Sequence, residues 1–148
     1  MIYNPNYPNT AIQMPQILHK DLSYRLTGLL FKVHKELGRF ARERQYGDKL
    51  ENLLKADGLE FQREYDIKKL EAASPKGNRV DFLVSKVIIV DLKAKPFITK
   101  EDYFQMRRYL QASNLELGII VNFRVYKLAP KRVLNSSYSD HTDKNLYH

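Results

Sequence analysis

The feature that most constrains the fold is the stretch RVDFLVSKVIIVDLK, residues 79–93. Two runs rich in β-branched and apolar residues are separated by only a few residues around Lys86, which predicts an antiparallel hairpin of two central, buried strands. Charged side chains frame the apolar runs, with Asp81 in the first strand and Asp91 and Lys93 in the second. A fold that buries this hairpin must also accommodate these charges.

The register of the hairpin decides whether the two aspartates meet. Strand residues alternate between the two faces of a sheet, so a turn centred on Lys86 places Asp81 opposite Asp91. The same register puts Lys93 on the face that carries Asp91. A two-residue turn would instead pair Asp81 with Val90 and send Asp91 to the opposite face. A shared site for the charges therefore requires a turn centred on Lys86.

Apolar periodicity predicts two helices before the hairpin. Leucines at spacings of three and four predict one helix that starts near Leu18 and ends at Gly38. A second helical pattern includes Glu43 and stops at Gly58. Glu43 falls on the stripe expected to face the core, so its carboxylate is predicted to point inward. Residues 60–70 then alternate polar and apolar side chains, which predicts a half-exposed strand.

Beyond the hairpin the pattern returns to helix and then to strand. Thr99, followed by Asp102 three residues later, predicts the start of a helix. The apolar segment 115–123 predicts another buried strand, and residues 126–134 predict a short edge strand because Pro130 cannot donate a ladder hydrogen bond. This order of elements is typical of an α/β domain in which helices flank a small mixed central sheet.

Length and composition bound the domain organisation. The 148 residues fit one domain, with an N-terminal arm over residues 1–16, the domain over 17–134 and a C-terminal tail over 135–148. No apolar run approaches the roughly 20 residues of a membrane helix, and the first residues do not resemble a signal peptide. The absence of cysteine excludes disulfides and thiolate zinc sites and fits a reducing cytoplasm, which is the location we expect.

The charge balance favours polyanionic partners. Lys and Arg number 25 against 17 Asp and Glu, which gives a net charge of +8. Cationic surfaces bind nucleic acids by neutralising phosphates and releasing counterions. Charge alone is not specific, however, since many basic proteins bind no polyanion.

Two carboxylates opposed in a buried hairpin repel each other unless a proton or a cation offsets their charge. Mg²⁺ prefers carboxylate oxygens and water as ligands, and a nearby lysine such as Lys93 can orient or activate a water that attacks a phosphodiester. Glu43 is then a third candidate ligand beside Asp81 and Asp91. The alternative is structural: Asp81 caps a strand end, and Asp91 pairs with Lys93 or Lys95 at an exposed strand terminus, worth under about 1 kcal/mol.

Several segments resemble one known family, and they occur in its order. They are VHKELG, ERQY, RVDFLV, VIIVDLKA, QMRRYL and LGIIVNF, and together they span about residues 20–134. They resemble the GxxExxY family, which is placed in the PD-(D/E)XK nuclease superfamily. The resemblance implies a restriction-endonuclease-like core with the element order αβββαβ. It also implies a metal-dependent nuclease, with DNA as the favoured substrate.

The resemblance assigns the catalytic set residue by residue. The acid of the first core helix is matched by Glu43, the motif aspartate by Asp81, and the (D/E)xK pair by Asp91 with Lys93. The three carboxylates would hold Mg²⁺ or Mn²⁺, and the lysine would position or activate water. A supporting Q-x3-Y element is matched by Gln105 and Tyr109, which without the resemblance are an ordinary polar pair one helical turn apart.

Two positions depart from the family pattern. Phe40 stands where the family has its first glycine, and the segment LGRFARERQY replaces a glycine-rich entry to the helix. Asp91 stands where glutamate is more frequent, so its carboxylate reaches about one methylene less far. Neither departure removes a catalytic group.

Five basic residues are together expected to contact the nucleic-acid backbone around the site, although each taken alone is more typical of an ordinary solvated surface. They are Arg79, Lys95, Lys100, Arg107 and Arg108. Two other functions stay open: a nucleic-acid-binding module that does not cleave, and a regulatory protein that keeps the fold. A homodimer is compatible with a domain of this size, although no residue pattern requires one.

Overall fold

The computed structural model describes residues 10–67 and 78–138 of the chain. The helices are α1 (Thr10–Leu37), α2 (Glu43–Ala56) and α3 (Lys100–Ser113). The strands are β1 (Phe61–Asp66), β2 (Arg79–Val84), β3 (Ile88–Lys93), β4 (Leu117–Asn122) and β5 (Lys131–Leu134). The predicted arm and tail lie mostly outside the described residues, as does most of the predicted loop between β1 and β2.

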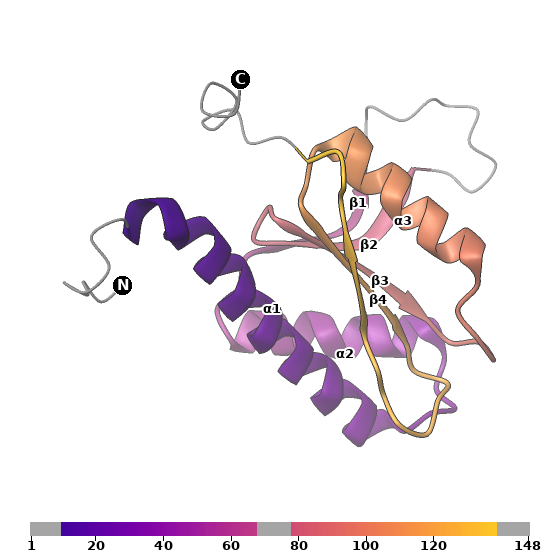
Figure 1. The fold of residues 1–148 in the computed structure, drawn as a ribbon. Coiled ribbons are helices and arrows are strands. Elements are labelled where there is room, and N and C mark those ends of the chain that lie inside the picture. Colours follow the sequence, from indigo (N-terminus) through magenta and orange to yellow (C-terminus); the bar gives the residue numbers. More distant parts are fainter. Residues whose placement is uncertain (1–9, 68–77, 139–148) are drawn as a thin grey trace.

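The five strands form one mixed sheet in the order β1-β2-β3-β4-β5. β3 and β4 run parallel, and the other neighbouring pairs are antiparallel. Helices α1 and α2 cover one face of the sheet, and α3 covers the other (Figure 1). The α/β fold predicted from the order of elements is confirmed, including β5 at the edge directly after Pro130.

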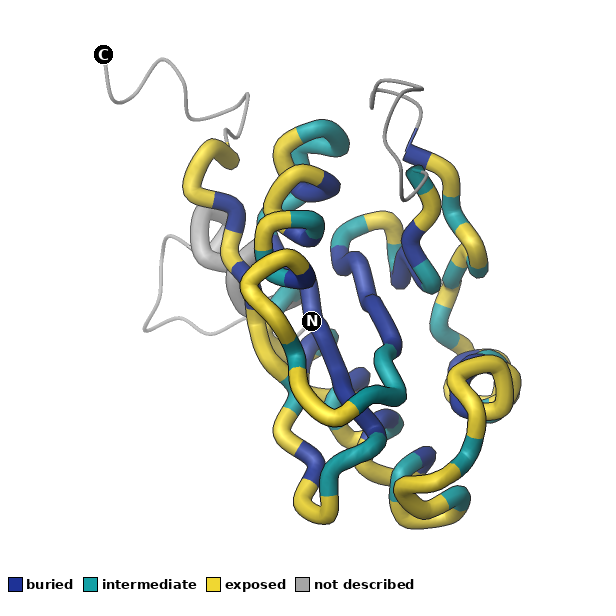
Figure 2. Tube along the Cα trace, turned by 90° about the vertical axis from the view of Figure 1, so that its right-hand side faces the viewer, coloured by how far each residue is buried: buried dark blue, intermediate teal, exposed yellow. Residues whose placement is uncertain are grey.

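The core has one layer on each face of the sheet. Leu30 of α1 and Tyr46 of α2 are fully buried against one face, while Met106 of α3 is fully buried against the other. Figure 2 shows the central strands as the buried middle of the molecule. Full burial of one large apolar side chain contributes about 1.5–3 kcal/mol. Packing of many such side chains holds the helices against the sheet and so fixes the positions of the strand ends.

Helix boundaries follow local signals where the sequence has them. α1 ends at Gly38, whose φ of 74° is left-handed and whose N–H donates to the His34 carbonyl at 2.8 Å. α3 begins after Thr99, whose hydroxyl accepts from the Asp102 N–H, as predicted. The start of α1 differs from the prediction, because the helix begins at Thr10 rather than near Leu18. The residues between alternate irregularly between polar and apolar types and include Pro15, which is unfavourable inside a helix.

The hairpin has the register that the shared site requires. Phe82 pairs with Val90 and Val84 pairs with Ile88, so three residues centred on Lys86 connect the strands. Within the connection, Ser85 and Lys86 have φ values of 50° and 61°. The Val87 N–H donates to the Val84 carbonyl at 3.0 Å, as in a type I′ turn with one extra residue.

None of the helices within the described part of the chain is both long and apolar enough to cross a bilayer. Asn135, at the expected start of the tail, is buried and belongs to the folded domain. Its side-chain amide donates to the carbonyls of Leu110 at 3.1 Å and Leu115 at 2.9 Å. These bonds tie the residue that follows β5 to the end of α3.

Candidate active site

Past the pair of Phe82 and Val90, side-chain hydrogen bonds replace the backbone ladder between β2 and β3. The Leu92 N–H donates to Asp81 Oδ2 at 2.6 Å, and the Asp81 N–H donates to Asp91 Oδ1 at 3.5 Å. Each carboxylate thus accepts from an amide of the opposite strand. The register brings the two predicted aspartates into contact, at the point where the strands part.

The electrostatic cost of this contact falls on Asp81. Burial raises the pKa of Asp81 from its ordinary value of 3.8 to about 7, and the negative charges of Asp91 and Glu43 add to the rise. The hydrogen bond from the Leu92 N–H opposes the shift. Near neutral pH the Asp81 carboxyl is therefore divided between its protonated and ionised forms. A cation at this position would favour the ionised form.

Lys93 is the positive charge of the site. Its Nζ lies 3.4 Å from Asp91 Oδ2 and 4.0 Å from Asp102 Oδ1. Burial lowers the pKa of Lys93, but the carboxylates of Asp91 and Asp102 more than offset that effect, so its pKa lies above the ordinary value. The Lys93 side chain is therefore an ammonium ion at neutral pH.

Asp102 belongs to this charge cluster, which the sequence did not indicate. Its side chain is buried, caps α3 through the Thr99 N–H at 2.8 Å, and lies 2.5 Å from Lys95 Nζ. Burial raises the pKa of Asp102, but the bonds from Lys95 and Thr99 outweigh it and hold the pKa below its usual range. From the sequence this residue is predictable only as part of a helix start, because its partners lie on β3 and the following loop.

Asn122 is a second buried polar residue that the sequence analysis did not assign to the site. It pairs in register with Lys93 across β3 and β4. Its Oδ1 accepts from the Lys95 N–H at 3.2 Å and the Arg124 N–H at 3.2 Å, and its Nδ2 donates to the Lys95 carbonyl at 2.7 Å. In the sequence, Asn122 is the polar residue at the end of an otherwise apolar strand. This position is the feature that could have identified it as the residue that holds the loop after β3.

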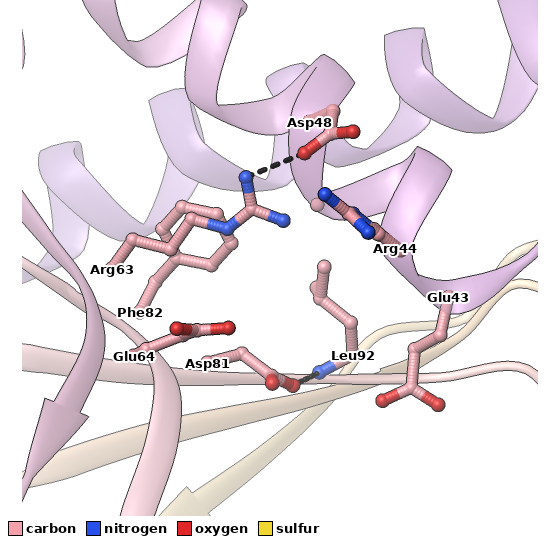
Figure 3. A pocket seen from close by; sticks show the side chains of 9 residues that line it. Glu43, Arg44, Asp48, Arg63, Glu64, Asp81, Phe82 and Leu92 are labelled. Carbon is pink, nitrogen blue, oxygen red and sulfur yellow. Dashed lines mark hydrogen bonds and ion pairs between the residues drawn. The ribbon is translucent and has the colours of Figure 1, made fainter.

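Glu43 is not buried on the core stripe, so that part of the prediction is wrong, although its side chain is directed toward the sheet. α2 begins at Glu43, one turn before its buried stripe starts at Tyr46, and the Glu43 side chain is exposed. Figure 3 shows it extending from the start of α2 past Leu92 toward the strands. Partial burial and the charge of Asp91 raise the pKa of Glu43, against the opposing effect of nearby lysines, so the carboxylate lies within electrostatic reach of the site.

The chemistry of the Asp81 and Asp91 pair fits a hard divalent cation, because such an ion would relieve the repulsion that raises the pKa of Asp81. Within residues 10–67 and 78–138, no three Asp, Glu or His side chains gather closely enough to hold one ion. The sheet explains the separation. Asp91 shares the α3 face of β3 with Ile89, whereas Glu43 belongs to α2 on the other face.

A cavity of about 490 Å³ opens beside Asp81, between α2 and the β1–β2 edge of the sheet (Figure 3). It is lined by Glu43, Arg44, Gly47, Asp48, Arg63, Glu64, Asp81, Phe82 and Leu92. Arg63 donates to Asp48 Oδ1 at 2.7 Å, and its guanidinium carbon lies 5.6 Å from the centre of the Phe82 ring. The cavity therefore combines fixed cationic and apolar walls with the Asp81 carboxylate.

Glu64 is an acid in the cavity that the sequence analysis did not single out. The paired residues on either side place it opposite Asp81, since Arg63 pairs with Phe82 and Tyr65 with Val80. Its φ of 54° is left-handed, which is uncommon for a residue with a side chain. Such backbone strain is concentrated at functional sites, and here it interrupts the ladder next to the proposed catalytic aspartate.

The predicted supporting pair lies on the α3 side of the site. The Gln105 side-chain amide donates to the Tyr109 hydroxyl. Burial raises the pKa of Tyr109, and the negative charge of Asp91 adds to this rise. Tyr109 is therefore both buried and within electrostatic range of the aspartate pair.

The five predicted backbone-gripping residues fall into two groups. Lys95 is only partly exposed and is committed to Asp102. The other four are exposed and take part in no ion pair within the described residues: Arg79, Lys100, Arg107 and Arg108. Three of these four lie on α3.

Comparison with known proteins assigns the family. A search of curated proteins finds no match. One solved structure, described as the crystal structure of SSO0001, is 19% identical and covers 79% of this chain and 68% of that chain, with a TM-score of 0.46. The family profile described as PD-(D/E)XK nuclease superfamily matches residues 20–133, most of the sequence. The chain therefore belongs to the PD-(D/E)XK nuclease superfamily.

Proposed function

We propose that this protein is a divalent-metal-dependent nuclease that hydrolyses phosphodiester bonds, with DNA as its favoured substrate. The observation that supports it most is the contact of Asp81 with Asp91 beside Lys93. These residues match the acids and the lysine of the superfamily motif. Within the superfamily we propose the GxxExxY family, because Glu43 and Tyr46 occupy the E and Y positions of its pattern, with Phe40 in place of the glycine.

In this proposal Asp81 and Asp91 would hold Mg²⁺ or Mn²⁺, with Glu43 as the third carboxylate. A bound ion supplies Lewis-acid chemistry, which lowers the pKa of water and polarises the scissile phosphate. Lys93 orients the attacking water and stabilises negative charge on the phosphate. Its raised pKa favours this role over that of a base, because an ammonium group cannot accept a proton.

The remaining predicted residues have supporting roles. Gln105 and Tyr109 fix the α3 side of the site through their mutual hydrogen bond. The exposed arginines and lysine on α3, with Arg79, contact the phosphates of the substrate backbone. Lys95 joins them only by leaving Asp102. A cytoplasmic location and a homodimer stay predictions.

A cleavage assay tests this function directly. Supercoiled and linear DNA, single-stranded DNA and RNA are incubated with the protein and Mg²⁺ or Mn²⁺, with EDTA as the metal-free control. We expect cleavage that EDTA abolishes and that Lys93→Ala lowers about 100- to 1,000-fold, as is typical for loss of one group that stabilises developing charge. Asp81→Asn and Asp91→Asn are expected to abolish metal-dependent cleavage.

Lys86→Ala is the matched control. Lys86 lies in the β2–β3 turn with an exposed side chain, so its loss changes net charge by the same amount without touching the site. Cleavage by Lys93→Ala at the rate of Lys86→Ala would contradict the proposed role of Lys93.

The second candidate function is a nucleic-acid-binding module that does not cleave. The observation that favours it is that no three metal-ligating side chains gather in the described parts of the chain. Tight binding of DNA by the native protein, without cleavage under any metal condition, would decide for this function.

A further inference from the structure

Phe40 is a large apolar side chain that the fold leaves in solvent. It lies in the loop between α1 and α2 and is 75% exposed. Two arginines accompany its ring: the guanidinium carbon of Arg39 lies 4.9 Å from the ring centre, and that of Arg124 lies 5.9 Å from it. An exposed aromatic ring next to cationic groups gains from cation–π attraction but still presents most of its surface to a partner.

The arginines also hold two loops together. Arg39 Nε donates to the Arg124 carbonyl at 3.1 Å, and Arg124 Nε donates to the Arg39 carbonyl at 3.2 Å. This reciprocal pair joins the α1–α2 loop to the connection between β4 and β5. Phe40 therefore belongs to a cross-linked surface rather than to a single unsupported loop.

Tyr46 anchors the same loop from below. Its hydroxyl donates to the Gly38 carbonyl at 2.6 Å and accepts from the Ala41 N–H at 3.1 Å. The Tyr46 ring is fully buried and stacks on Phe123, with 4.2 Å between ring centres. Bonds on both sides of Phe40 thus keep the loop fixed while the Phe40 ring stays outside the core.

This surface lies at the same end of the sheet as the site. Phe40 precedes Glu43 by three residues, so their Cα atoms are at most about 10 Å apart. Arg124 follows Asn122 by two residues, and Asn122 pairs in register with Lys93. One side-chain oxygen of Asn122 accepts from the amides of both Lys95 and Arg124, which fixes the two loops relative to each other.

We propose that Phe40, Arg39 and Arg124 form a stacking platform for an unpaired base next to the cleavage site, so that the substrate carries a single-stranded segment. The proposal rests on the proposed function, since it names the substrate class of that site. Phosphates need only cations, whereas a flat apolar ring suits the face of a base. Proteins that bind single strands combine aromatic rings with basic residues in this way. In a continuous duplex the base faces are covered by their neighbours.

Binding in EDTA tests the platform without cleavage. Fluorescence anisotropy compares a labelled single strand with a blunt duplex of the same length. Phe40→Ala is expected to weaken single-strand binding about 5- to 100-fold, the range for loss of one stacked base, and to change duplex binding less than about twofold. Phe40→Trp is expected to keep single-strand affinity, and Phe40→Leu is expected to lose it as Phe40→Ala does.

Tyr24→Ala is the matched control, because Tyr24 is an aromatic residue on α1 that is 80% exposed. Its removal is expected to change neither affinity. Salt dependence separates ring from charge: Phe40→Ala leaves the slope of log affinity against log salt unchanged, while Arg124→Gln lowers it by about 1. Thermal unfolding checks that each variant is folded. Because Phe40 is exposed, we expect its substitutions to leave the folded state intact.

The outcomes separate this proposal from the nuclease assignment. Equal single-strand affinity of Phe40→Ala and the native protein overturns the platform, as does an equal loss on single strand and duplex. Absence of cleavage under all metal conditions overturns the proposed function, yet a single-strand-specific loss in Phe40→Ala would still establish the platform.

Discussion

Asp81 combines burial with two negative neighbours, and its raised pKa measures the resulting conflict. A site built only for stability would replace one of the facing acids by a neutral residue, since unpaired buried charge is destabilising. Asp91 is ion-paired with Lys93, whereas Asp81 forms no ion pair within the described residues and feels the charge of Lys93 only from a greater distance. Such a cluster of like charges lowers the stability of the folded protein, and it is typical of a functional site, here one that could bind a cation.

The first prediction at this scale concerns Asp81→Asn in metal-free buffer. The folded pKa of about 7 lies above the unfolded value near 3.8, so the native state binds more protons between these pH values. Stability of the native protein therefore falls as pH rises from about 4 to about 7, and the lower level persists above it. Asparagine removes the charge but keeps an acceptor for the Leu92 N–H. We expect a gain on the order of 1–3 kcal/mol at pH 8 that becomes smaller as the pH falls and is lost near pH 4.

Chemical unfolding in EDTA at several pH values measures this effect. Asp57→Asn serves as control, because Asp57 is exposed and pairs with Arg25 on the surface. Addition of Mg²⁺ should stabilise the native protein more than it stabilises the Asp81→Asn variant. A variant that is less stable than the native protein at pH 8 would show that the carboxylate of Asp81 is structural.

The helices and strands were largely predictable, because each has a local cause. Strand parity left two turns open, and the turn centred on Lys86 was predicted as the one that lets Asp81 and Asp91 share a site; the structure has that register. The position of Glu43 was not predictable, since apolar spacing sets the direction of a stripe but not the residue at which the helix begins. Asp102 and Asn122 escaped because their partners are distant in the sequence. Hairpin register is thus a local property, whereas the cluster of polar side chains that includes Asp102 and Asn122 depends on how β3, α3 and β4 pack together.

The prediction at the scale of elements concerns the packing of α2 on β1. A Cβ at Gly47 would lie 2.6 Å from Arg63 Nη2, so Gly47→Ala forces the arginine away from Asp48 and changes the cavity beside Asp81. We expect cleavage to fall about tenfold, since small displacements at a site are costly. Stability is expected to stay within about 1 kcal/mol, because the helix propensity of alanine offsets the lost surface ion pair.

Gly28→Ala is the control for this substitution. Gly28 lies within α1, and an added Cβ would meet no atom within 4 Å. The control is expected to gain about 0.5–1 kcal/mol without any change in cleavage. Cleavage rates and denaturant midpoints of both variants check the pair of expectations. Unchanged cleavage by Gly47→Ala would exclude the cavity from the substrate path.

The two faces of the sheet carry different parts of the proposed site. The α1 and α2 side supplies Glu43, the cavity and the loop of Phe40, while α3 supplies Asp102, Tyr109 and a row of exposed basic residues. Asp81 and Asp91 lie between them, where β2 and β3 part. A substrate that reaches the aspartates must therefore contact both sides of the sheet end, which the net charge of +8 favours without specifying where.

The prediction at this scale asks whether α3 or the overall charge governs nucleic-acid binding. Arg107→Gln with Arg108→Gln removes two exposed charges from α3, and Lys32→Gln with Lys35→Gln removes two from the surface of α1. Net charge changes equally in both double variants. If α3 contacts phosphates, only its variant lowers the slope of log affinity against log salt, by about 1 to 2. Titrations of one DNA at several salt concentrations measure the slopes. Equal slopes in the two variants would assign binding to net charge. If the phosphates contacted α3 specifically, only removal of the α3 cations would reduce the number of counterions released on binding.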